Sequence, residues 1–331
     1  MGLMGWYDAV GRRAFFAMDA ETAHRVAHRL LGLPLPWRRI GGASQDPALA
    51  TSLAGVALRN PIGLAAGFDK TGAHVDALGA LGFGYVVTGT VTKGAREGNP
   101  RPRIVRDPGR QALVNAMGLP NPGAREVART LSGRRRTCPR FVSIADEAVE
   151  DALETLALVA PYADGIELNA SCPNVSWGRD RDNEAHVRGL VGAMRARTPA
   201  PLFVKLPPFD APTERDVVLA LARIAQEAGA DGLTCGNTRP VDDPRLAVGR
   251  GGLSGRPLWD RTASSVHEVR EATGGATAVN ACGGIFTAAD VAACLGAGAA
   301  TVQLYTALIY RGPGVVGELT RGLAGRPAKR R

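Results

Sequence analysis

Two carboxamides and a thiol follow an apolar run near the middle of the chain. Asn169, Cys172 and Asn174 come directly after residues 163–168, a run that predicts a buried strand. Pro173 restricts the backbone between the thiol and the second carboxamide. Each carboxamide can donate and accept hydrogen bonds, and an accessible thiolate can act as a base or a nucleophile. These residue types suit a pocket for a polar, planar substrate, and the alternative is a turn around a buried thiol.

Other polar residues lie at or after the ends of predicted strands. Lys70 and Lys205 each follow an apolar run, Asn237 comes directly after another, and Asn115 lies in a long insert. Asparagine disfavours strand interiors, so asparagines that gather near strand ends favour a shared ring of carboxamides over separate turns. Two lysines at strand ends favour a flavin-type role, because a cation near the N1/C2=O edge stabilises the anionic reduced ring. Surface salt bridges are the alternative for both lysines.

Glycines gather after the last two predicted strands. Gly283 and Gly284 follow one strand, Thr306 follows the other, and residues 251–255 form a further glycine-rich stretch. The backbone N–H groups of such turns hold phosphate in barrels of parallel strands. We therefore expect a ligand that carries phosphate, with ordinary turns as the alternative.

The elements that must position these residues alternate regularly from residue 60 onward. Apolar runs predict strands at residues 62–66, 85–89, 141–145, 165–169, 202–206, 232–235, 278–282 and 301–305. Helical patterns lie between them at residues 71–81, 148–159, 184–197, 213–228, 262–272 and 288–295. This alternation predicts a parallel (β/α)8 TIM barrel over residues 41–331, with its site at the carboxyl ends of the strands. The inserts at residues 90–140 and 239–260 are expected to cover that site.

Residues 1–40 differ from the barrel and predict an N-terminal helical extension. Aromatic residues recur at helical spacing around Phe15 and Phe16, and Asp19 has the position of an N-cap for a second helix. Two amphipathic helices with exposed aromatic and arginine side chains could lie on a membrane interface. A helical hairpin packed on the barrel is the equal alternative.

Composition excludes several classes of protein. The chain has 331 residues, of which 45% are hydrophobic, and its formal net charge is +9. The 5 cysteines lack paired spacing, which favours a reducing cytosol, and no pattern of metal ligands is present. Aromatic residues are only 5% and are not interleaved with the basic runs, so the charge favours a solvated surface or an anionic membrane face over nucleic acid.

Several stretches in one order resemble the dihydroorotate dehydrogenase family over nearly the whole chain. The matching motifs lie at residues 60–70, 97–103, 169–174, 251–258 and 303–306. The N-terminal helices resemble the membrane-associated, quinone-using class, in which they form a hydrophobic tunnel to the flavin. The resemblance implies a TIM barrel that binds FMN and oxidises dihydroorotate to orotate.

The resemblance also implies which residues contact each ligand. FMN would contact Ala65, Ala66, Gly67, Lys70, Gly89, Thr90, Asn115, Ser143, Asn169, Lys205, Gly236, Ser254, Gly255, Gly283, Gly284, Leu304, Tyr305 and Thr306. Dihydroorotate would be held by Lys70, Asn115, Asn169, Asn174, Asn237 and Thr238. His24 and Arg106 fall where the quinone class lines its tunnel.

The implied reaction removes a proton from C5 of dihydroorotate and transfers a hydride from C6 to flavin N5. Cys172 would be the base, as in the soluble classes, whereas the quinone class usually has serine there. A thiol with an ordinary pKa of about 8.5 is a better base near neutrality than an alcohol if a nearby lysine lowers that pKa. Two further departures are Ser143, where the quinone class carries asparagine, and Leu119, where a phenylalanine usually packs on the substrate.

These features predict a cytoplasmic enzyme of pyrimidine biosynthesis that contacts the cytoplasmic membrane peripherally through residues 1–40 and reduces quinone. Dihydroorotate, orotate and quinone are the expected partners, and neither nucleic acid nor a metal is expected. Three alternatives stay open. Electrons could pass to a soluble acceptor such as fumarate, the substrate could be a related dihydropyrimidine, or the chain could be a phosphate-binding barrel without redox activity.

Overall fold

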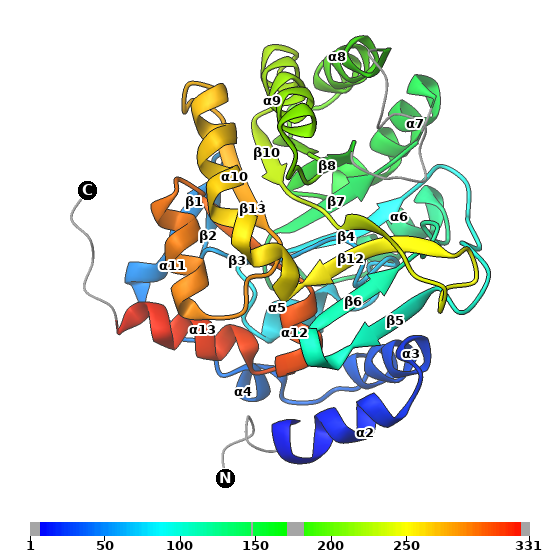
Figure 1. Cartoon of the computed structure of the whole chain (residues 1–331), viewed down its shortest axis with the longest axis vertical. Coiled ribbons are helices and arrows are strands. Elements are labelled where there is room, and N and C mark those ends of the chain that lie inside the picture. The colour runs from blue at the N-terminus through cyan, green and yellow to red at the C-terminus, as the bar shows by residue number, and fades with distance from the viewer. Residues whose placement is uncertain (1–6, 147, 171–181, 326–331) are drawn as a thin grey trace.

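The centre of the molecule is a closed barrel of parallel strands (Figure 1). The computed structural model describes residues 7–146, 148–170 and 182–325. The barrel strands are β3 (Ile62–Leu64), β4 (Tyr85–Val91), β7 (Arg140–Ile144), β8 (Gly165–Asn169), β9 (Leu202–Lys205), β10 (Gly232–Cys235), β13 (Ala278–Cys282) and β14 (Thr301–Leu304). They close in the order β10-β13-β14-β3-β4-β7-β8-β9, so the predicted (β/α)8 fold is confirmed.

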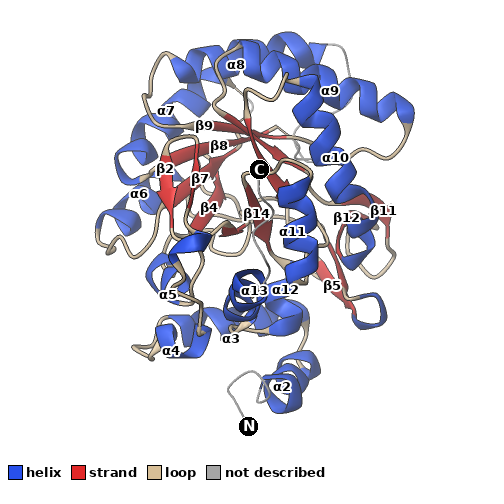
Figure 2. Ribbon diagram, turned by 90° about the vertical axis from the view of Figure 1, so that its left-hand side faces the viewer, coloured by secondary structure: helices blue, strands red, loops and turns tan. Residues whose placement is uncertain are grey.

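Helices surround the barrel and bury the outer face of every strand (Figure 2). They are α5 (Val75–Ala80), α6 (Ala124–Ser132), α7 (Val149–Val159), α8 (Asp182–Arg195), α9 (Pro212–Glu227), α10 (Trp259–Ala272), α11 (Ala288–Gly296), α12 (Thr306–Arg311) and α13 (Val315–Ala324). Burial on both faces explains why the strands are continuous apolar runs that sequence patterning finds.

The helix predicted at residues 71–81 begins later than expected. The Asp69 carboxylate accepts hydrogen bonds from the backbone N–H groups of Thr71, Gly72 and His74, at 2.8–3.1 Å. These bonds hold residues 71–74 in a turn, and helix α5 starts only at Val75. A short acidic side chain therefore competes with the helix for the same N–H donors.

The amino ends of the barrel strands are closed by aromatic rings and a hairpin. Tyr85, Phe141 and Phe203 lie in a row inside the barrel, with ring centroids 5.1 and 5.3 Å apart. The hairpin of β1 (Thr51–Leu53) and β2 (Val56–Leu58) packs its leucines against these rings. This end is therefore filled, which leaves the carboxyl ends of the strands for ligands.

The two long inserts pair with each other across the carboxyl ends. Their strands are β5 (Ile104–Asp107), β6 (Ala112–Asn115), β11 (Arg239–Asp242) and β12 (Arg250–Gly255). They form an antiparallel sheet in the order β11-β12-β6-β5, here named the cover sheet (Figure 1). Strands β6 and β12 pair with Ser254 opposite Leu113. The sequence predicted that these inserts cover the site but did not predict their strands.

The N-terminal extension packs on the cover sheet and on α12. It contains a π-helical turn (Tyr7–Gly11), α2 (Arg12–Ala17), α3 (Ala20–Leu31) and α4 (Trp37–Gly41), the last of which the sequence did not predict. The Asp19 carboxylate accepts from the Thr22 N–H at 2.9 Å, which confirms the predicted N-cap. Glu21 on α3 forms a 2.7 Å ion pair with the buried Arg103, directly before β5. Phe16 packs edge-on against Tyr310 of α12, with centroids 5.2 Å apart.

The extension also leaves apolar side chains exposed. Among the described residues, the exposed large hydrophobic side chains are Val10, Leu30, Leu33, Leu35, Val217 and Val248. All but the last two belong to residues 1–40, so exposed apolar surface concentrates on one segment. Within the described ranges, every helix is too short or too polar to cross a bilayer.

Candidate functional site

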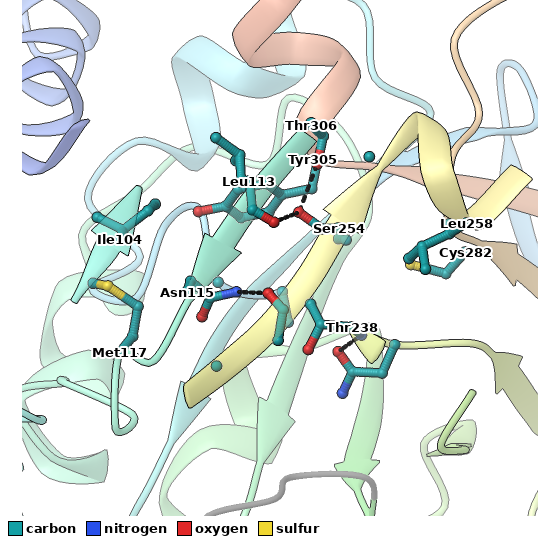
Figure 3. A pocket seen from close by; sticks show the side chains of 18 of the residues that line it. Ile104, Leu113, Asn115, Met117, Thr238, Ser254, Leu258, Cys282, Tyr305 and Thr306 are labelled. Carbon is teal, nitrogen blue, oxygen red and sulfur yellow. Dashed lines mark hydrogen bonds between the residues drawn. The ribbon is translucent and has the colours of Figure 1, made fainter. Parts of the chain in front are cut away.

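A cavity of about 760 Å³ lies between the carboxyl ends of the barrel strands and the cover sheet. Its size falls in the range of small-molecule sites. Barrel strands supply the floor, and the cover sheet supplies Ile104, Leu113, Asn115 and Ser254 (Figure 3). The loops after β10 and β14 add Thr238 and Tyr305 to the lining, and the end of β13 adds Cys282.

Most of the residues predicted as contacts line this one cavity. They are Ala65, Ala66, Gly67, Lys70, Thr90, Asn115, Asn169, Lys205, Asn237, Thr238, Ser254, Gly255, Gly283, Gly284, Leu304, Tyr305 and Thr306. Strand ends that lie far apart in sequence therefore meet as the barrel geometry requires. Cys172 and Asn174 lie outside the described residues.

Lys205 is directed into the cavity and has no partner. Lys205 is only 5% exposed. Within the described residues, its ammonium forms no salt bridge and donates no hydrogen bond. Burial is the largest effect and lowers its pKa, but the electrostatic influence of Cys282 and Glu167 together raises the pKa overall. The sequence placed this ammonium at an open mouth, but the cover sheet closes above it, so it is buried. A buried cation without a partner indicates that the cavity takes an anionic or electron-rich ligand.

Lys70 is the second cation of the cavity. Its ammonium donates to the Gly67 carbonyl at 2.6 Å. Burial, followed by the nearby Arg103 guanidinium, lowers the pKa of Lys70 to about 8. The side chain is therefore held at the edge of the cavity in a state that loses its proton just above neutrality.

Three of the predicted carboxamides line the same space, and Figure 3 shows Asn115 among them. Asn115 on β6 donates to the Gly252 carbonyl at 3.4 Å, and Asn169 at the end of β8 donates to Thr90 Oγ1 at 3.1 Å. Asn237 Oδ1 accepts from the Thr238 N–H at 2.8 Å. Asn99, which the sequence analysis did not single out, adds a fourth carboxamide and donates to the Ala116 carbonyl at 2.9 Å.

Hydroxyls and glycine backbone form the opposite end of the cavity. Ser254 Oγ and Thr306 Oγ1 lie 3.0 Å apart, so the cover sheet and the start of α12 meet there (Figure 3). Gly255 and Gly284 have φ values of +97° and +64°, which side chains rarely adopt. A Cβ at Gly284 would lie 2.5 Å from the Trp259 nitrogen, so this turn needs glycine. The arrangement presents backbone N–H groups and hydroxyls, which are donors suited to phosphate.

Three predicted cofactor contacts do not line the cavity. Ser143 is fully buried behind Thr90, with the two hydroxyls 3.2 Å apart. Gly89 is engaged through its carbonyl, which accepts from the Gly67 N–H at 2.6 Å. Gly236 packs so closely on the next strand that a Cβ there would lie 2.2 Å from the Cys282 carbonyl oxygen. These positions support the residues that line the cavity and do not form its surface.

His24 and Arg106 also lie outside the cavity lining. Arg106 donates to the carbonyls of Phe15 and Met18, so it ties the extension to the cover sheet. His24 lies 5.4 Å from the Phe68 ring, and Phe68 lies 6.1 Å from Tyr305, which lines the cavity. Burial lowers the pKa of His24 to about 2, so this ring is neutral at physiological pH. Aromatic side chains therefore connect the extension with the cavity.

Sequence reasoning missed the apolar part of the lining, which comes from the first of the two inserts. Ile104, Leu113 and Met117 supply apolar surface above the polar floor. The local signal was a pair of short apolar runs, residues 104–105 and 112–114, on each side of Pro108-Gly109, which is a turn signal. Within the described residues, no group of His, Cys, Asp and Glu could hold a metal ion.

Comparisons with known proteins agree with this site. The family model described as dihydroorotate dehydrogenase matches residues 48–326. A curated dihydroorotate dehydrogenase (quinone) of Bordetella pertussis is 37% identical, and the match covers 95% of this chain and 96% of that protein. The corresponding protein of Halorhodospira halophila is also 37% identical, with 97% and 99% covered.

Solved structures show the same fold. The dihydroorotate dehydrogenase of Eimeria tenella, crystallised with ferulenol, superposes with a TM-score of 0.80 and 31% identity. The match covers 92% of this chain and 90% of that one. The ligand-free structure of the same Eimeria protein has the same TM-score and identity. The resemblance drawn from the motifs is thus confirmed.

Proposed function

Because the chain belongs to the dihydroorotate dehydrogenase family, we propose that it oxidises (S)-dihydroorotate to orotate and passes the electrons to a quinone. This is the redox step of pyrimidine biosynthesis. The curated relatives carry this activity in their names. The observation that supports it in this chain is the Lys205 ammonium, which is buried without a partner in a cavity lined by carboxamides.

Members of this family depend on a flavin, and FMN is the flavin that we propose here. The residues present fit it, because the cavity offers an unpaired cation on one side and hydroxyl and backbone donors on the other. FMN would supply the two-electron acceptor that the oxidation requires. Lys205 would hold the edge of its ring, and Gly255, Gly284 and Thr306 would hold its phosphate.

Dihydroorotate would be oriented by the carboxamides and by Lys70. Asn115, Asn169 and Asn237 lie on different elements, so together they fix a planar ring from several directions. Thr238 and Asn174 complete this set, and Cys172 would accept the proton from C5. General-base catalysis of this kind contributes about 10²–10⁴ in rate.

Anaerobic reduction of the purified protein tests the cofactor and the substrate together. The protein should purify yellow, and dihydroorotate should bleach its flavin absorbance in a stoichiometric titration without oxygen. Dihydrouracil, which lacks the carboxylate, serves as the control for a related dihydropyrimidine. A colourless protein that binds no added FMN would support the non-redox barrel and refute the proposal.

The electron acceptor needs a separate experiment. The relatives' names favour quinone, whereas the cysteine at position 172 favours a soluble acceptor such as fumarate. Reoxidation of the reduced protein should be fast with a short-chain ubiquinone and slow with fumarate at equal concentration. The reverse order would assign the chain to a soluble acceptor and leave the first half-reaction unchanged.

We also propose that residues 1–40 contact the cytoplasmic face of a membrane, where quinone is dissolved. Val10, Leu30, Leu33 and Leu35 are 39–54% exposed, and Arg13, Arg25, Arg38 and Arg39 are exposed on the same segment. An apolar surface with basic residues beside it suits the interface of an anionic bilayer. The extension also packs on the cover sheet, so membrane contact and docking on the protein are compatible.

A further inference from the structure

A carboxylate lies inside the barrel, directly below the cavity. Glu167 is the third residue of β8 and is only 1% exposed. The side chains of Glu167 and Asn169 share one face of β8, because alternate residues of a strand point the same way. The interior of such barrels is normally filled by branched apolar side chains, and a buried carboxylate is costly there. Its presence therefore calls for a compensating partner.

Neutral hydrogen bonds compensate one of its two oxygens. Glu167 Oε2 accepts from Thr234 Oγ1 at 2.8 Å and from Gln303 Nε2 at 3.4 Å. Thr234 in turn accepts from Asn280 Nδ2 at 3.3 Å, and Asn280 accepts from the Thr301 hydroxyl. These donors all point toward Glu167, so the row of hydrogen bonds favours negative charge at its end.

The other oxygen of Glu167 remains without a partner. Among the described residues, both Glu167 Oε1 and Gln303 Oε1 are buried acceptors that receive no hydrogen bond. Gln303 lines the cavity together with Lys205. Two acceptors without donors and one ammonium without an acceptor therefore gather at the cavity floor. Polar groups of this kind are destabilising unless their charges offset one another.

Lys205, on the neighbouring strand β9, is a cation on which Glu167 acts electrostatically. It ends β9, where it pairs in register with Asn169 of β8, two residues beyond Glu167. The titratable groups that act on Lys205 are Glu167 from β8 and Cys282 from β13. Burial, together with Glu167, raises the pKa of the Cys282 thiol, so this thiol is neutral near pH 7. Glu167 is then the carboxylate that acts on the buried ammonium, and its influence raises the pKa of Lys205.

We propose that Glu167 is a positioning residue: it holds the Lys205 ammonium charged at the floor of the cavity, and flavin affinity depends on that charge. This inference rests on the proposed function, because it requires a flavin in the cavity. It assigns to the barrel interior a role in cofactor binding, although Glu167 does not line the cavity. The electrostatic pair acts below the ligand, where solvent does not screen it.

The test is the dissociation constant of FMN as a function of pH, measured by the quenching of flavin fluorescence. For the wild type, Lys205 stays charged between pH 7 and pH 9.5, so affinity should change only as far as the titration of Lys70 near pH 8 affects it. In Glu167→Gln, the contribution of Glu167 against burial is lost, and affinity should fall by about tenfold for each pH unit above a midpoint at least about one unit lower than in the wild type. Lys205→Met should bind FMN weakly at every pH in this range.

Three further variants separate charge from structure. Glu167→Asp keeps the charge and should keep the wild-type profile. Thr234→Val removes a hydrogen bond to the carboxylate but not the charge, so its midpoint should stay in place. Glu167→Leu restores the apolar filling that barrels prefer, so it provides a folded charge-free variant if Glu167→Gln is unstable. The melting temperature of each apoprotein reports folding independently of the flavin.

The outcomes distinguish this inference from the proposed function. If the wild type binds no FMN at any pH, the proposed function fails and this inference fails with it. If the wild type binds FMN and both charge-free variants keep its pH profile, only the role of Glu167 is refuted. A shifted profile in Thr234→Val as large as in Glu167→Gln would also refute it, because disruption of packing would then explain the effect.

Discussion

Several residues of this site have a burial, a pKa or an arrangement that is unusual for their side chains. Lys205 is buried without a partner, Lys70 has a pKa of about 8, and Asn115, Asn169 and Asn237 converge from separate elements. Perturbed groups of this kind cluster at functional sites, since burial and nearby charges are what tune them. Predictions at this scale concern protonation states.

Lys70 should impose an alkaline limit on activity. Its pKa in the folded protein is lowered to about 8, so the ammonium is present below that pH and lost as pH rises through it. If the ammonium helps to bind dihydroorotate, kcat/KM for flavin reduction should decline above about pH 8, because this ratio reports the free enzyme. Lys70→Met should lower kcat/KM and remove this limb, whereas the exposed control Lys93→Met should keep the wild-type profile. If kcat/KM still declines above about pH 8 in Lys70→Met, a titratable group other than Lys70 causes the decline.

Cys172 should be needed for chemistry and not for cofactor retention. Replacement by alanine should leave FMN bound while the rate of flavin reduction by dihydroorotate falls by about 10²–10⁴, the usual contribution of a general base. Cys172→Ser should retain activity with its optimum displaced to higher pH, because an alcohol is a weaker acid than a thiol. Stopped-flow absorbance without oxygen measures both variants, and Cys138→Ala, at a buried thiol remote from the cavity, is the matched control. Near-wild-type reduction in Cys172→Ala would exclude this thiol as the base.

At the scale of elements, the cover sheet joins three parts of the molecule. Its strands β6 and β12 come from inserts that are far apart in sequence, and α3 docks against β5 through Glu21 and Arg103. The side chains of this ion pair are only 13% and 9% exposed. A buried ion pair holds elements in place chiefly because removal of one partner leaves the other charge unpaired.

Glu21→Gln should therefore loosen the extension. We expect a loss of about 3 kcal/mol in the free energy of unfolding of the docked extension, as for other broken buried pairs. Quinone reduction should slow while flavin reduction by dihydroorotate stays near wild type. The exposed pair of Glu126 and Arg129 offers a control, since Glu126→Gln should change stability by less than about 0.5 kcal/mol. Hydrogen exchange of α3 and urea unfolding measure both effects; equal slowing of both half-reactions would contradict this separation of roles.

At the scale of the whole molecule, the catalytic cavity and the exposed apolar segment belong to neighbouring parts. The extension lies beside the cover sheet (Figure 1). The Phe68 ring connects His24 with Tyr305, which lines the cavity. A quinone carried by the membrane would thus need to cross only the extension to reach the flavin. Each of the described helices is too short or too polar to span a bilayer.

The double variant Leu33→Asp/Leu35→Asp should weaken binding to vesicles. Both leucines are exposed, at 48% and 41%, so the charges should not disturb the core. Cosedimentation with vesicles that contain anionic lipid should fall by about tenfold or more, because two apolar anchors are lost and two negative charges are added. Val217→Asp, at a 50% exposed position on α9, is the control and should bind as the wild type does. Unchanged cosedimentation of the double variant would exclude this segment as the contact.

Local sequence was sufficient to determine the barrel and most of its site. Strands buried on both faces must be apolar runs, as residues 165–169 and 232–235 are, and their ends must face one cavity once the barrel closes. Asp19 caps its helix through a bond to a residue three positions away, so it too was visible in the sequence. The asparagines and lysines followed from the same rule about strand ends.

Only the tertiary structure decided which distant residues meet. The pairing of β6 with β12 joins residues more than a hundred positions apart, and no local pattern specifies it. Ser143 lies behind Thr90 because its strand places that side chain one layer below the cavity. Glu167 lies below Lys205 for the same reason, since strand register sets the layer that each side chain occupies. Register depends on contacts between strands, and those contacts form only when the barrel closes.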